Sequence, residues 1–388
     1  MPDEEKPYRV YKSGRGRGKI PSLGPRRKPA SLGRPPTGPK PPRAPKSTRR
    51  RVLQGIGIVV CLFVAWLAAW ILASYFSFRD GVDAANARLP VSAKRALTHK
   101  GGMLFDTSTT ILLLGTDHAT FSGRTSSHRT DSIMLMRTDP GHDRIYYLSI
   151  PRDLYVPIPA HGQDRINAAY QFGGPALTLR TIEALTGLKV NHIAVVDFNE
   201  FKKLIDELGG ITVNVPKPIW SNKFDCPFSA ARCRTWNGWH FKRGEQHMNG
   251  QRALIYTRVR ENRLDPGEND LSRADRQQQV IQAVSSKLAS AGTFLDLPFI
   301  GGDLMKPLAT DLSAGDFIQL GWVRFRAGSV HCRLGGDGEF VNGADVLIPS
   351  EDNRGVISMF TGESAPQPPP PGTSNQPGCV VGNKQLPR

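Results

Sequence analysis

The feature that most constrains this chain is an uncharged apolar segment near its amino terminus. Residues 52–76 read VLQGIGIVVCLFVAWLAAWILASYF, a run of 25 residues without a charge. A helix of that length is long enough to cross the hydrocarbon core of a bilayer. Three arginines stand directly before the segment, and Asp80 and Asp83 follow it, so the positive-inside rule places the amino terminus in the cytoplasm. We therefore predict a single membrane helix over 52–76 and an extracytoplasmic location for most of the chain.

Positive charge is concentrated before this segment. Residues 1–51 hold 16 Lys and Arg against three acidic residues, which accounts for +13 of the formal net charge of +17. The same stretch is rich in Pro, Gly and Ser and has no apolar periodicity, so we predict a disordered cytoplasmic tail. A cleaved signal peptide is the alternative, but it would have a shorter apolar region and a shorter leader. We expect an uncleaved anchor.

The basic tail has three interpretations: a solvated orientation signal, an anchor to anionic lipid headgroups, or an arm that binds nucleic acid. Proteins that bind single strands stack bases on aromatic side chains, and only Tyr8 and Tyr11 lie among these charges. We expect the orientation signal and no nucleic-acid partner.

The positions of the cysteines agree with export. Cys61 lies in the apolar segment, and the other four cysteines, at 226, 233, 332 and 379, all follow it. They form no Cys-x-x-Cys pair, which argues against a structural zinc site and for disulfides in an oxidising compartment. Four cysteines allow three connectivities, and proximity in the sequence favours Cys226–Cys233 and Cys332–Cys379.

Residues 105–347 are enough for one sizeable domain. Apolar runs predict strands, segments with helical spacing predict helices, and the Gly-Gly pair at 209–210 ends one of the helices. The predicted strands are 110–114, 132–137, 144–150, 192–198 and 211–215, and the predicted helices are 175–186 and 199–208. This alternation indicates an α/β domain with a central mixed sheet flanked by helices on both faces. We expect residues 77–104 to be an extracytoplasmic linker, 220–239 a loop with its own disulfide, and 348–388 a Pro-rich carboxyl-terminal tail.

Five arginine-bearing segments adjoin the apolar runs: RTD at 129–131, PRD at 151–153, RIN at 165–167, RVR at 258–260 and RADRQ at 273–277. A guanidinium is always charged and donates hydrogen bonds in a fixed fork. Several of them at the ends of buried elements are unfavourable unless a polyanion lies between them. We therefore predict a site for phosphate or pyrophosphate.

Two aspartates are candidate metal ligands. Asp117 follows the strand-like run ILLLGT, at a carboxyl strand end, where α/β sheets place their ligands. Asp131 stands at the start of the next strand, so the two carboxylates can converge. Two carboxylates with phosphate oxygens and water form a typical environment for Mg²⁺. Taken alone, Asp117 is better explained as the cap of a turn.

Several of the arginines would also fit an ordinary structural role when each is taken alone. Arg152 and Asp153 end a strand and would serve a turn there. In extended backbone Arg258 and Arg260 point to one side and can clamp a phosphate, but an exposed strand face would look the same.

The last arginine segment is predicted to open a helix. Ser272 resembles an N-cap, with Asp275 at the third helical position. This places Arg273, Arg276 and Gln277 in the first turn, where the helix dipole disfavours positive side chains. A bound anion reverses that argument, because the helix start and two guanidiniums then form a phosphate site. A solvated surface turn is the alternative.

Taken together and in this order, the motifs resemble the LytR-CpsA-Psr family of bacterial cell-envelope proteins. The resemblance spans about residues 110–289 and rests on ILLLGTD, RTDSIML, LSIPRD, RINAAY, VDFNEFKKLIDELGGITVNVP, LIYTRVR and SRADRQQQVI. The arrangement of a cytoplasmic tail, one span and an exported domain is also similar to that of the family.

The resemblance implies a transferase that moves a glycopolymer from a polyprenyl-pyrophosphate carrier in the membrane lipid onto peptidoglycan, through a phosphodiester. It implies that Asp117 and Asp131 hold Mg²⁺. It also implies that the pyrophosphate is surrounded by Arg129, Arg152, Arg258, Arg260, Arg273, Arg276 and Gln277. At position 165 this chain has an arginine where the family usually has a lysine. The positive charge is kept, but a compact ammonium group is replaced with a planar guanidinium that can donate two parallel hydrogen bonds.

The implied chemistry is consistent with these residues, because phosphoryl transfer is catalysed chiefly by positioning and by neutralising charge. Asp153 is our candidate for the base that takes the proton of the attacking hydroxyl, because it adjoins Arg152 at a strand end. An apolar channel between the layers would hold the polyprenyl chain, and no motif calls for a cofactor besides the metal. Two alternatives stay open: a hydrolase that uses the same site, and a non-enzymatic anchor that binds an anionic wall polymer.

Overall fold

A computed structural model describes residues 48–116, 130–259, 261–265, 270–288, 290–370 and 376–382. The chain divides into two units, residues 1–60 and residues 61–388, and each is described by itself. Residues 1–47 of the predicted tail lie outside the described residues. The first unit therefore contributes only the start of helix α1 (Thr48–Arg88) to this description.

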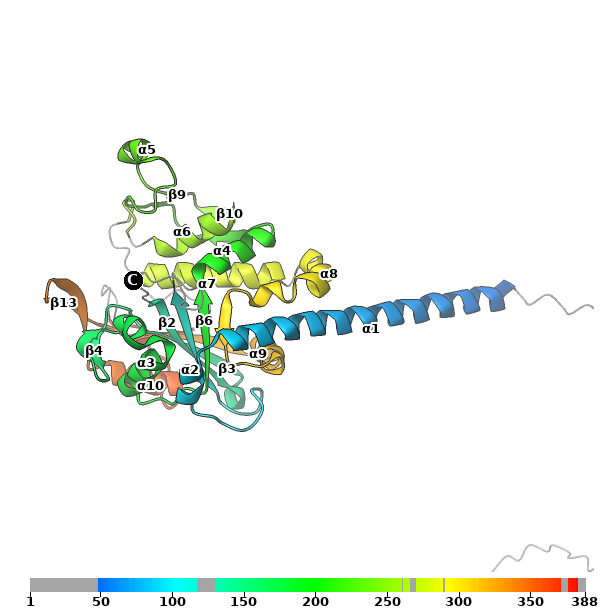
Figure 1. The fold of residues 1–388 in the computed structure, drawn as a ribbon, viewed down its shortest axis with the longest axis horizontal. Coiled ribbons are helices and arrows are strands. Elements are labelled where there is room, and N and C mark those ends of the chain that lie inside the picture. The colour runs from blue at the N-terminus through cyan, green and yellow to red at the C-terminus, as the bar shows by residue number, and fades with distance from the viewer. Residues whose placement is uncertain are drawn as a thin grey trace, which may run out of the picture. The chain divides into compact units, whose positions relative to one another are not determined.

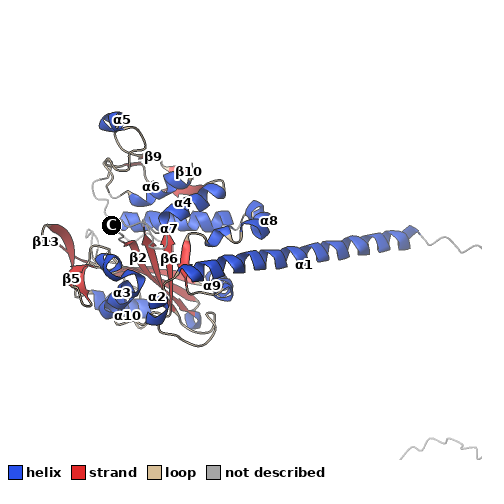
Figure 2. Ribbon diagram, in the orientation of Figure 1, coloured by secondary structure: helices blue, strands red, loops and turns tan. Residues whose placement is uncertain are grey.

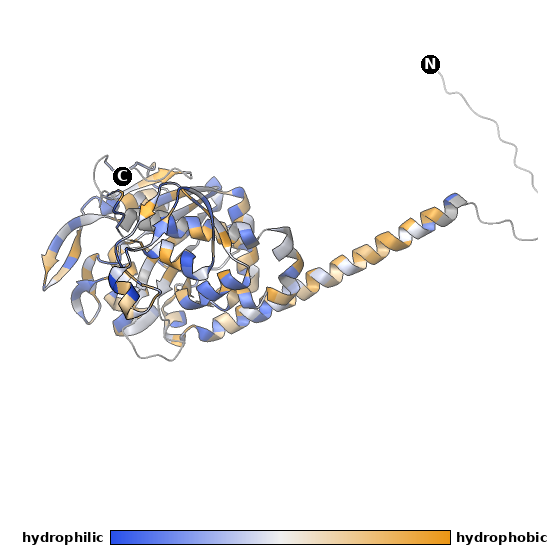
Figure 3. Cartoon of the chain, turned by 90° about the horizontal axis from the view of Figure 1, so that it is seen from above, coloured by the Kyte–Doolittle hydropathy of each residue, from blue (hydrophilic) through white to orange (hydrophobic). Residues whose placement is uncertain are grey.

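Helix α1 contains the uncharged segment and is long and apolar enough to cross a membrane. Figure 3 shows apolar residues in orange along much of its length. The helix does not stop at residue 76 but continues to Arg88. The prediction of a helix over 52–76 is therefore confirmed, and the helix is longer than expected.

Residues 77–104, for which the sequence predicts a linker, are packed against the domain. Val82 and Ala85 near the end of α1 are completely buried beside Met305 and Ala314. Helix α2 (Val91–Ala96) follows after Pro90 and contributes Ala93 to the main core. The structure differs from the expectation because the apolar residues of this stretch are too widely spaced to stand out in the sequence.

The centre of the domain is a mixed sheet of seven described strands (Figure 2, red). Its order across the sheet is β11 (Leu308–Thr310), β6 (His192–Asp197), β1 (Thr110–Thr116), β2 (Thr130–Asp139), β3 (Arg144–Ser149), β12 (Gly328–Arg333) and β15 (Gly378–Val381). Strand β1 is parallel to β6 and antiparallel to β2, and β3 is antiparallel to β2 and parallel to β12. The predicted α/β class and the mixed sheet are confirmed.

These directions place particular strand ends together. The carboxyl ends of β1, β3, β6 and β12 share one edge of the sheet with the amino ends of β2, β11 and β15, since these three are antiparallel to their neighbours. We call this the carboxyl edge. It is where the motifs that follow β1 and β3 must lie.

One face of the sheet carries the main hydrophobic core. Leu112 and Leu114 of β1 and Ile133 and Leu135 of β2 are at most 2% exposed. Helices α2, α3 (Ala168–Thr186) and α10 (Asn353–Thr361) cover them, and their apolar side chains belong to the same buried cluster. Figure 1 shows these three helices gathered on one side of the strands. In α3 the helix is interrupted at Gly173-Gly174 and resumes at Pro175, where the sequence predicts its start.

The opposite face is covered less completely. Leu113, Met134, Met136 and Tyr147 alternate with the buried residues and are only half-buried. The register pairs Leu113 with Met134 and Met136 with Tyr147, so the four form a continuous row across β1, β2 and β3. We call this row the apolar strip. Helices α7 (Asp270–Leu288) and α9 (Ala314–Arg326) approach this face, since Gln277 bonds Ser132 and Arg324 lies near Tyr147.

A histidine adjoins the strip. His331 of β12 stacks on Tyr147 with ring centroids 5.1 Å apart. Burial, and next the positive charge of Arg324, lower the pKa of His331 to about 4. Burial also raises the pKa of Tyr147, which Arg324 partly offsets. The imidazole of His331 is therefore neutral at pH 7 in the folded protein.

Acidification is expected to destabilise the domain through this histidine. Between about pH 6.5 and pH 4 the unfolded chain binds a proton at His331 that the folded chain does not, so stability falls as pH falls, by at most about 3 kcal/mol. Thermal unfolding of the detergent-solubilised chain at pH 7 and pH 4.5 measures the loss. His331→Phe keeps a stacked ring without a titrating group, and its melting temperature should fall less on acidification. Equal falls in both proteins would contradict the assignment.

A second core lies beyond the carboxyl end of β6. Helix α4 (Phe198–Glu207) follows β6 directly, with Asp197 as its N-cap, and it ends before Gly209, as the sequence predicts. It packs with α6 (Gly250–Arg258), α7 and the two-stranded sheet of β7 (Ile211–Val215) and β10 (Gly244–Met248). In Figure 1 the arrowhead of β6 points toward this layer of helices. The predicted strand 211–215 exists, but it pairs with β10 and not with the central sheet.

The remaining elements are short hairpins, helices and turns. They are the hairpins β4 (Tyr155–Ile158) with β5 (Gly162–Arg165), β8 (Ile219–Trp220) with β9 (His240–Phe241) and β13 (Gly336–Val341) with β14 (Ala344–Pro349), the helices α5 (Ala230–Thr235) and α8 (Ala291–Ile300), and the 3₁₀ turns η2 (Pro140–His142) and η3 (Asp303–Met305).

Both predicted disulfides are present. Cys226–Cys233 closes the loop between β8 and β9, which contains α5 as its only described helix. Cys332–Cys379 joins β12 to β15 at directly paired positions. The carboxyl-terminal segment is thus not only a Pro-rich tail, because α10 and β15 belong to the main core.

Candidate active site

The structure describes the predicted site residues unequally. Asp117, Arg129 and Arg260 lie outside the described residues, and of Asp131 and Arg273 only the backbone is described. The side chains that can be placed are those of Arg152, Asp153, Arg165, Arg258, Arg276 and Gln277. They fall into two groups, both reached from the carboxyl edge.

The first group follows β3. The Ile150 amide donates to the Ile133 carbonyl at 3.0 Å, so the β2–β3 pairing extends one residue beyond β3. Arg152 stands two residues after Ile150, and Asp131 stands two residues before Ile133. Because the strands are antiparallel, the backbones of Arg152 and Asp131 are on the same side of this last hydrogen bond.

The hairpin β4–β5 brings Arg165 to this group. Arg165 pairs with Tyr155, and the Ile166 amide donates to the Leu154 carbonyl at 2.8 Å. The Asn167 amide then donates to the carbonyl of Arg152 at 3.2 Å. The RIN motif is therefore folded back onto the PRD motif by backbone hydrogen bonds.

Asp153 lies between the two guanidiniums. Its Oδ2 accepts a hydrogen bond from Nε of Arg152 at 3.3 Å, and its Oδ1 is 3.7 Å from NH1 of Arg165. All three side chains are about four-fifths buried, so their charges are screened less than those of surface pairs. The carboxylate can thus orient both arginines.

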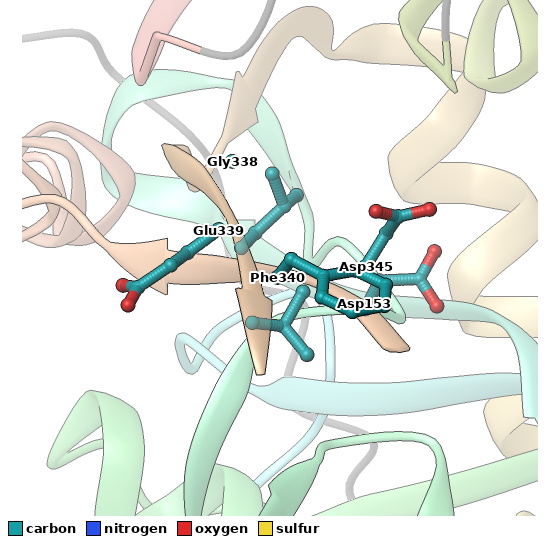
Figure 4. Close-up of a pocket in the computed structure, with 7 residues that line it drawn as sticks. Asp153, Gly338, Glu339, Phe340 and Asp345 are labelled. Atoms are coloured by element: carbon teal, nitrogen blue, oxygen red, sulfur yellow. The ribbon is translucent and has the colours of Figure 1, made fainter. Parts of the chain in front are cut away.

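A pocket of about 320 Å³ adjoins Asp153 on the side of the β13–β14 hairpin (Figure 4). Its lining includes two further carboxylates, Glu339 and Asp345, and the ring of Phe340. Figure 4 shows the carboxylates of Asp153 and Asp345 on one side and that of Glu339 on the other. Three negative charges disfavour a pyrophosphate, so a phosphate must approach from the side of the arginines.

The second group is built on α6 and α7. Arg258 is the last residue of helix α6, so the prediction that Arg258 and Arg260 share an extended strand is wrong at Arg258. The residues LIYT before it are all buried, and since four consecutive residues span most of the circumference of a helix, packing surrounds this helix up to Arg258. NH1 of Arg258 is 2.7 Å from Oδ2 of Asp225 in the disulfide-closed loop. A phosphate that binds Arg258 would compete with this carboxylate.

Helix α7 begins at Asp270, earlier than predicted. Ser272 is therefore inside the helix and does not cap it, and Arg276 and Gln277 lie in the second turn, where the helix dipole contributes little. Arg276 is 3% exposed and donates to the Val259 carbonyl. This contact holds the guanidinium beside the residue that follows Arg258.

Gln277 links the second group to the sheet. Its Oε1 accepts a hydrogen bond from the Ser132 hydroxyl at 3.1 Å, and Ser132 directly follows Asp131. Ser132 is also on the face of the sheet that carries the apolar strip, one register step from Met134. The start of β2 is therefore the point where α7, the strip and the backbone of Asp131 meet.

In the sequence, the predicted metal ligands adjoin the last described pair of β1 and β2. Thr116 and Thr130 are paired across β1 and β2, so Asp117 and Asp131 each follow a residue of this last pair. Among the described side chains, no group of three His, Cys, Asp or Glu is arranged to hold a metal. The ligand atoms of aspartate are oxygens, which suit a hard cation such as Mg²⁺.

Sequence reasoning missed three residues of this region. Ser132 lies inside a quoted motif, and Asp225 adjoins Cys226, but neither position predicts its contact. Arg333 ends β12 at the carboxyl edge and is 2% exposed. Its Nε donates to the Gln376 carbonyl at 2.9 Å, which ties down the carboxyl-terminal segment. No motif in the sequence marks it.

Comparison with known proteins decides the family. The LytR_cpsA_psr family matches residues 77–358, which is more than half of the chain and includes both groups of site residues. The chain belongs to the LytR-CpsA-Psr family. The match begins at residue 77, in agreement with the packing of the end of α1 and of α2 against the domain.

Relatives within the LytR-CpsA-Psr family carry two kinds of name. The chain is 33% identical over 249 residues to the regulatory protein MsrR of Staphylococcus aureus (strain COL), covering 63% of this chain and 68% of that protein. It is 33% identical over 271 residues to the polyisoprenyl-teichoic acid–peptidoglycan teichoic acid transferase TagU of Oceanobacillus iheyensis, covering 66% and 76%. The solved structure of the family protein YwtF (TagT) with bound octaprenyl pyrophosphate lipid superposes with a TM-score of 0.50 at 25% identity, covering 69% and 94%.

Proposed function

We propose that this chain is a membrane-anchored transferase that moves a glycopolymer from a polyprenyl-pyrophosphate carrier to peptidoglycan. The product is a phosphodiester, and polyprenyl phosphate is released. The family membership, the transferase name of one relative and the pyrophosphate lipid bound to another support the proposal.

The observation that carries the proposal is the position of the apolar strip. The strip reaches Met134, one register step from Ser132, and Ser132 bonds Gln277 beside the start of β2. A row of half-buried apolar side chains therefore ends at the start of β2, where Gln277 of α7 contacts Ser132 and the backbone of the PRD segment lies across from Asp131. A ligand with an apolar chain and an anionic head would match an apolar strip that leads to a cationic site.

The proposed reaction is an in-line phosphoryl transfer. A hydroxyl oxygen of the peptidoglycan sugar forms a bond to the phosphorus that carries the glycopolymer. The bond from that phosphorus to the bridging oxygen breaks, and the bridging oxygen leaves with the polyprenyl phosphate. Negative charge grows on the leaving phosphate, and fixed guanidiniums lower the barrier by neutralising it.

The residues take the following proposed roles. Arg152, Arg165, Arg258 and Arg276 bind the pyrophosphate with Gln277, and Arg129, Arg260 and Arg273 join them. Asp153 is proposed to take the proton of the attacking hydroxyl. Its contacts with Arg152 and Arg165 support a second role, which is to orient these two arginines.

Mg²⁺ is proposed to bind at Asp117 and Asp131. When bound, it would neutralise phosphate oxygens as a Lewis acid. Asp131 is at the amino end of β2, and in the sequence Asp117 directly follows Thr116, which pairs with Thr130. The two carboxylates would supply oxygen ligands, which suit a hard cation such as Mg²⁺.

We infer that the domain is extracytoplasmic and that α1 is an uncleaved anchor with its amino terminus in the cytoplasm. The arginines before the apolar segment set this orientation. Two disulfides beyond the segment support an oxidising compartment for the domain. The carrier lipid and peptidoglycan are then both within reach.

The deciding experiment is a transfer assay with the full chain in phospholipid vesicles. The vesicles contain a polyprenyl-pyrophosphate glycan labelled in its sugar, with Mg²⁺ and a peptidoglycan oligomer as acceptor. Label in the oligomer through a phosphodiester supports the transferase. Release of free labelled glycan would indicate a hydrolase, and binding without turnover would indicate an anchor.

A charge in the apolar strip is expected to weaken binding of the lipid carrier. Met134→Lys places an ammonium group against the polyprenyl chain, and loss of about 1.5 kcal/mol of apolar burial raises KM for the carrier about tenfold. The KM for a water-soluble short-chain analogue should not change. Val91→Lys, at an exposed residue of α2, is the matched control. Equal effects on both substrates would argue against lipid at the strip.

A further inference from the structure

Helix α9 presents a row of large apolar side chains outward. Ile318, Trp322 and Phe325 are spaced by four and three residues, so they share one face of the helix, and each is more than half exposed. The inward face packs through Phe317 and Val323. The outward row is therefore not a consequence of a loosely packed helix.

Helix α8 presents a similar row. Leu295 and Phe299 are one turn apart, and Phe299 is 82% exposed. Phe325 of α9 is 84% exposed, and no other large apolar side chain among the described residues is as exposed as these two phenylalanines. Large apolar side chains that are exposed in rows on two helices indicate a contact with a partner or a membrane.

Both helices are fixed to the outer part of α1. The Trp70 indole donates to the Leu295 carbonyl at 3.3 Å, and the Gly302 amide donates to the Ser77 hydroxyl at 3.2 Å. On α9, the ring of Phe317 lies edge-on to Phe78, with centroids 5.9 Å apart. In Figure 1 α8 and α9 flank the end of α1 that enters the domain.

These contacts determine the height of the helices along α1. Trp70 precedes the end of the apolar segment at Phe76 by six residues, which is about 9 Å along a helix. Helix α9, which contacts Phe78, adjoins the end of the apolar segment, and α8, which contacts Trp70, is level with its last turns. This is the depth, about 5–10 Å, at which interfacial helices bury their apolar faces.

We propose that Leu295, Phe299, Ile318, Trp322 and Phe325 form a membrane-contact surface that lies in the outer leaflet beside α1. The inference rests on the proposed anchoring of the chain through α1. The domain is then held by two peripheral helices in addition to its span. This fixes its tilt relative to the bilayer that supplies the lipid carrier.

The polar groups of the two helices suit the headgroup region. Arg324 and Arg326 lie in the last turn of α9, next to Phe325, where they can reach lipid phosphates. The exposed Arg326 forms a loose pair with Asp143, at 3.6 Å. Trp322 is a residue type typical of membrane interfaces. Asp296 of α8 is exposed and must face water or headgroups.

The test uses spin labels on the full chain in vesicles of phosphatidylethanolamine and phosphatidylglycerol. F325C and F299C are labelled in a background in which Cys61→Ala removes the free cysteine and the two disulfides stay oxidised. I71C, on the apolar part of α1, is the control for lipid. F340C, on the exposed β13 strand, is the control for water.

The readout is the collision of each label with oxygen and with a water-soluble nickel chelate. We expect the oxygen-to-nickel ratio at positions 325 and 299 to exceed that at 340 several-fold and to approach that at 71. A ratio equal to that at 340 at both positions overturns the proposal. A lipid-like ratio at 299 alone confines the contact to α8 and overturns the assignment of α9.

Two further outcomes would overturn the proposal in different ways. A water-like ratio at position 71 would show that α1 is not in the bilayer, which would overturn the anchoring itself. Dipolar broadening between labels that disappears on dilution with unlabelled chain would show that a second copy covers the surface. That result would overturn the membrane assignment while leaving the proposed transferase intact.

Discussion

Replacing Arg152 with alanine is expected to lower the rate of glycopolymer transfer by about 100- to 1000-fold, the usual cost of removing one donor that stabilises transition-state charge. Arg152 follows β3 at the carboxyl edge, and its guanidinium is oriented by Asp153. The loss should fall mainly on kcat, since the charge on the leaving phosphate grows in the transition state. The transfer assay in vesicles measures it. Arg152→Lys keeps the charge without the fork and should recover only part of the rate.

Asp153→Asn separates the two roles proposed for this carboxylate. A base is required for the proton of the hydroxyl, so its loss would lower kcat and remove the acidic limb of the pH–rate profile. An orienting carboxylate would leave the shape of the profile unchanged, because an amide oxygen can still accept from Arg152. Full activity in Asp153→Asn together with inactive Arg152→Ala would assign Asp153 to orientation. Full activity in Arg152→Ala would refute the role of the arginine.

The sequence predicted the central strands well because their burial is so regular. In β1 a continuous apolar run is buried almost throughout, and in β2 Ile133 and Leu135 alternate with half-buried methionines. The sequence could not show that β7 leaves the central sheet. A five-residue alternating strand has the same pattern in either sheet, and its partner β10 lies about thirty residues away in the chain.

The errors at the site also have physical causes. The local sequence TRVR favours extended backbone at Arg258, yet the buried residues from Ala253 to Tyr256 continue a helix into it. The residue type of Ser272 favours an N-cap, but α7 begins two residues earlier. Local propensity does not include the packing of α7 against α6 that extends the helix.

Some contacts were beyond any local pattern. The hydrogen bond between Ser132 and Gln277 joins residues 145 positions apart, and the pair of Arg258 with Asp225 depends on the fold of a disulfide-closed loop. Motif order identified the family and therefore the residue types of the site. The grouping of Arg152, Asp153 and Arg165 became visible only with the β4–β5 hairpin, since backbone hydrogen bonds fold RIN back onto PRD.

Asp131→Ala is expected to reduce Mg²⁺-dependent transfer by at least about 100-fold, because a metal ion contributes several kcal/mol of charge stabilisation and this change removes one of its two proposed carboxylates. Asp131 stands at the amino end of β2, beside the Ser132–Gln277 hydrogen bond and across from the PRD segment. Chelation of divalent cations should abolish wild-type transfer, and added Mg²⁺ should restore it. In Asp131→Ala the Mg²⁺ concentration for half-maximal rate should rise, whereas Asp143→Ala, at the opposite edge of the sheet, should behave as wild type. Transfer that survives chelation, or an unchanged Mg²⁺ requirement in Asp131→Ala, would show that the arginines alone neutralise the pyrophosphate.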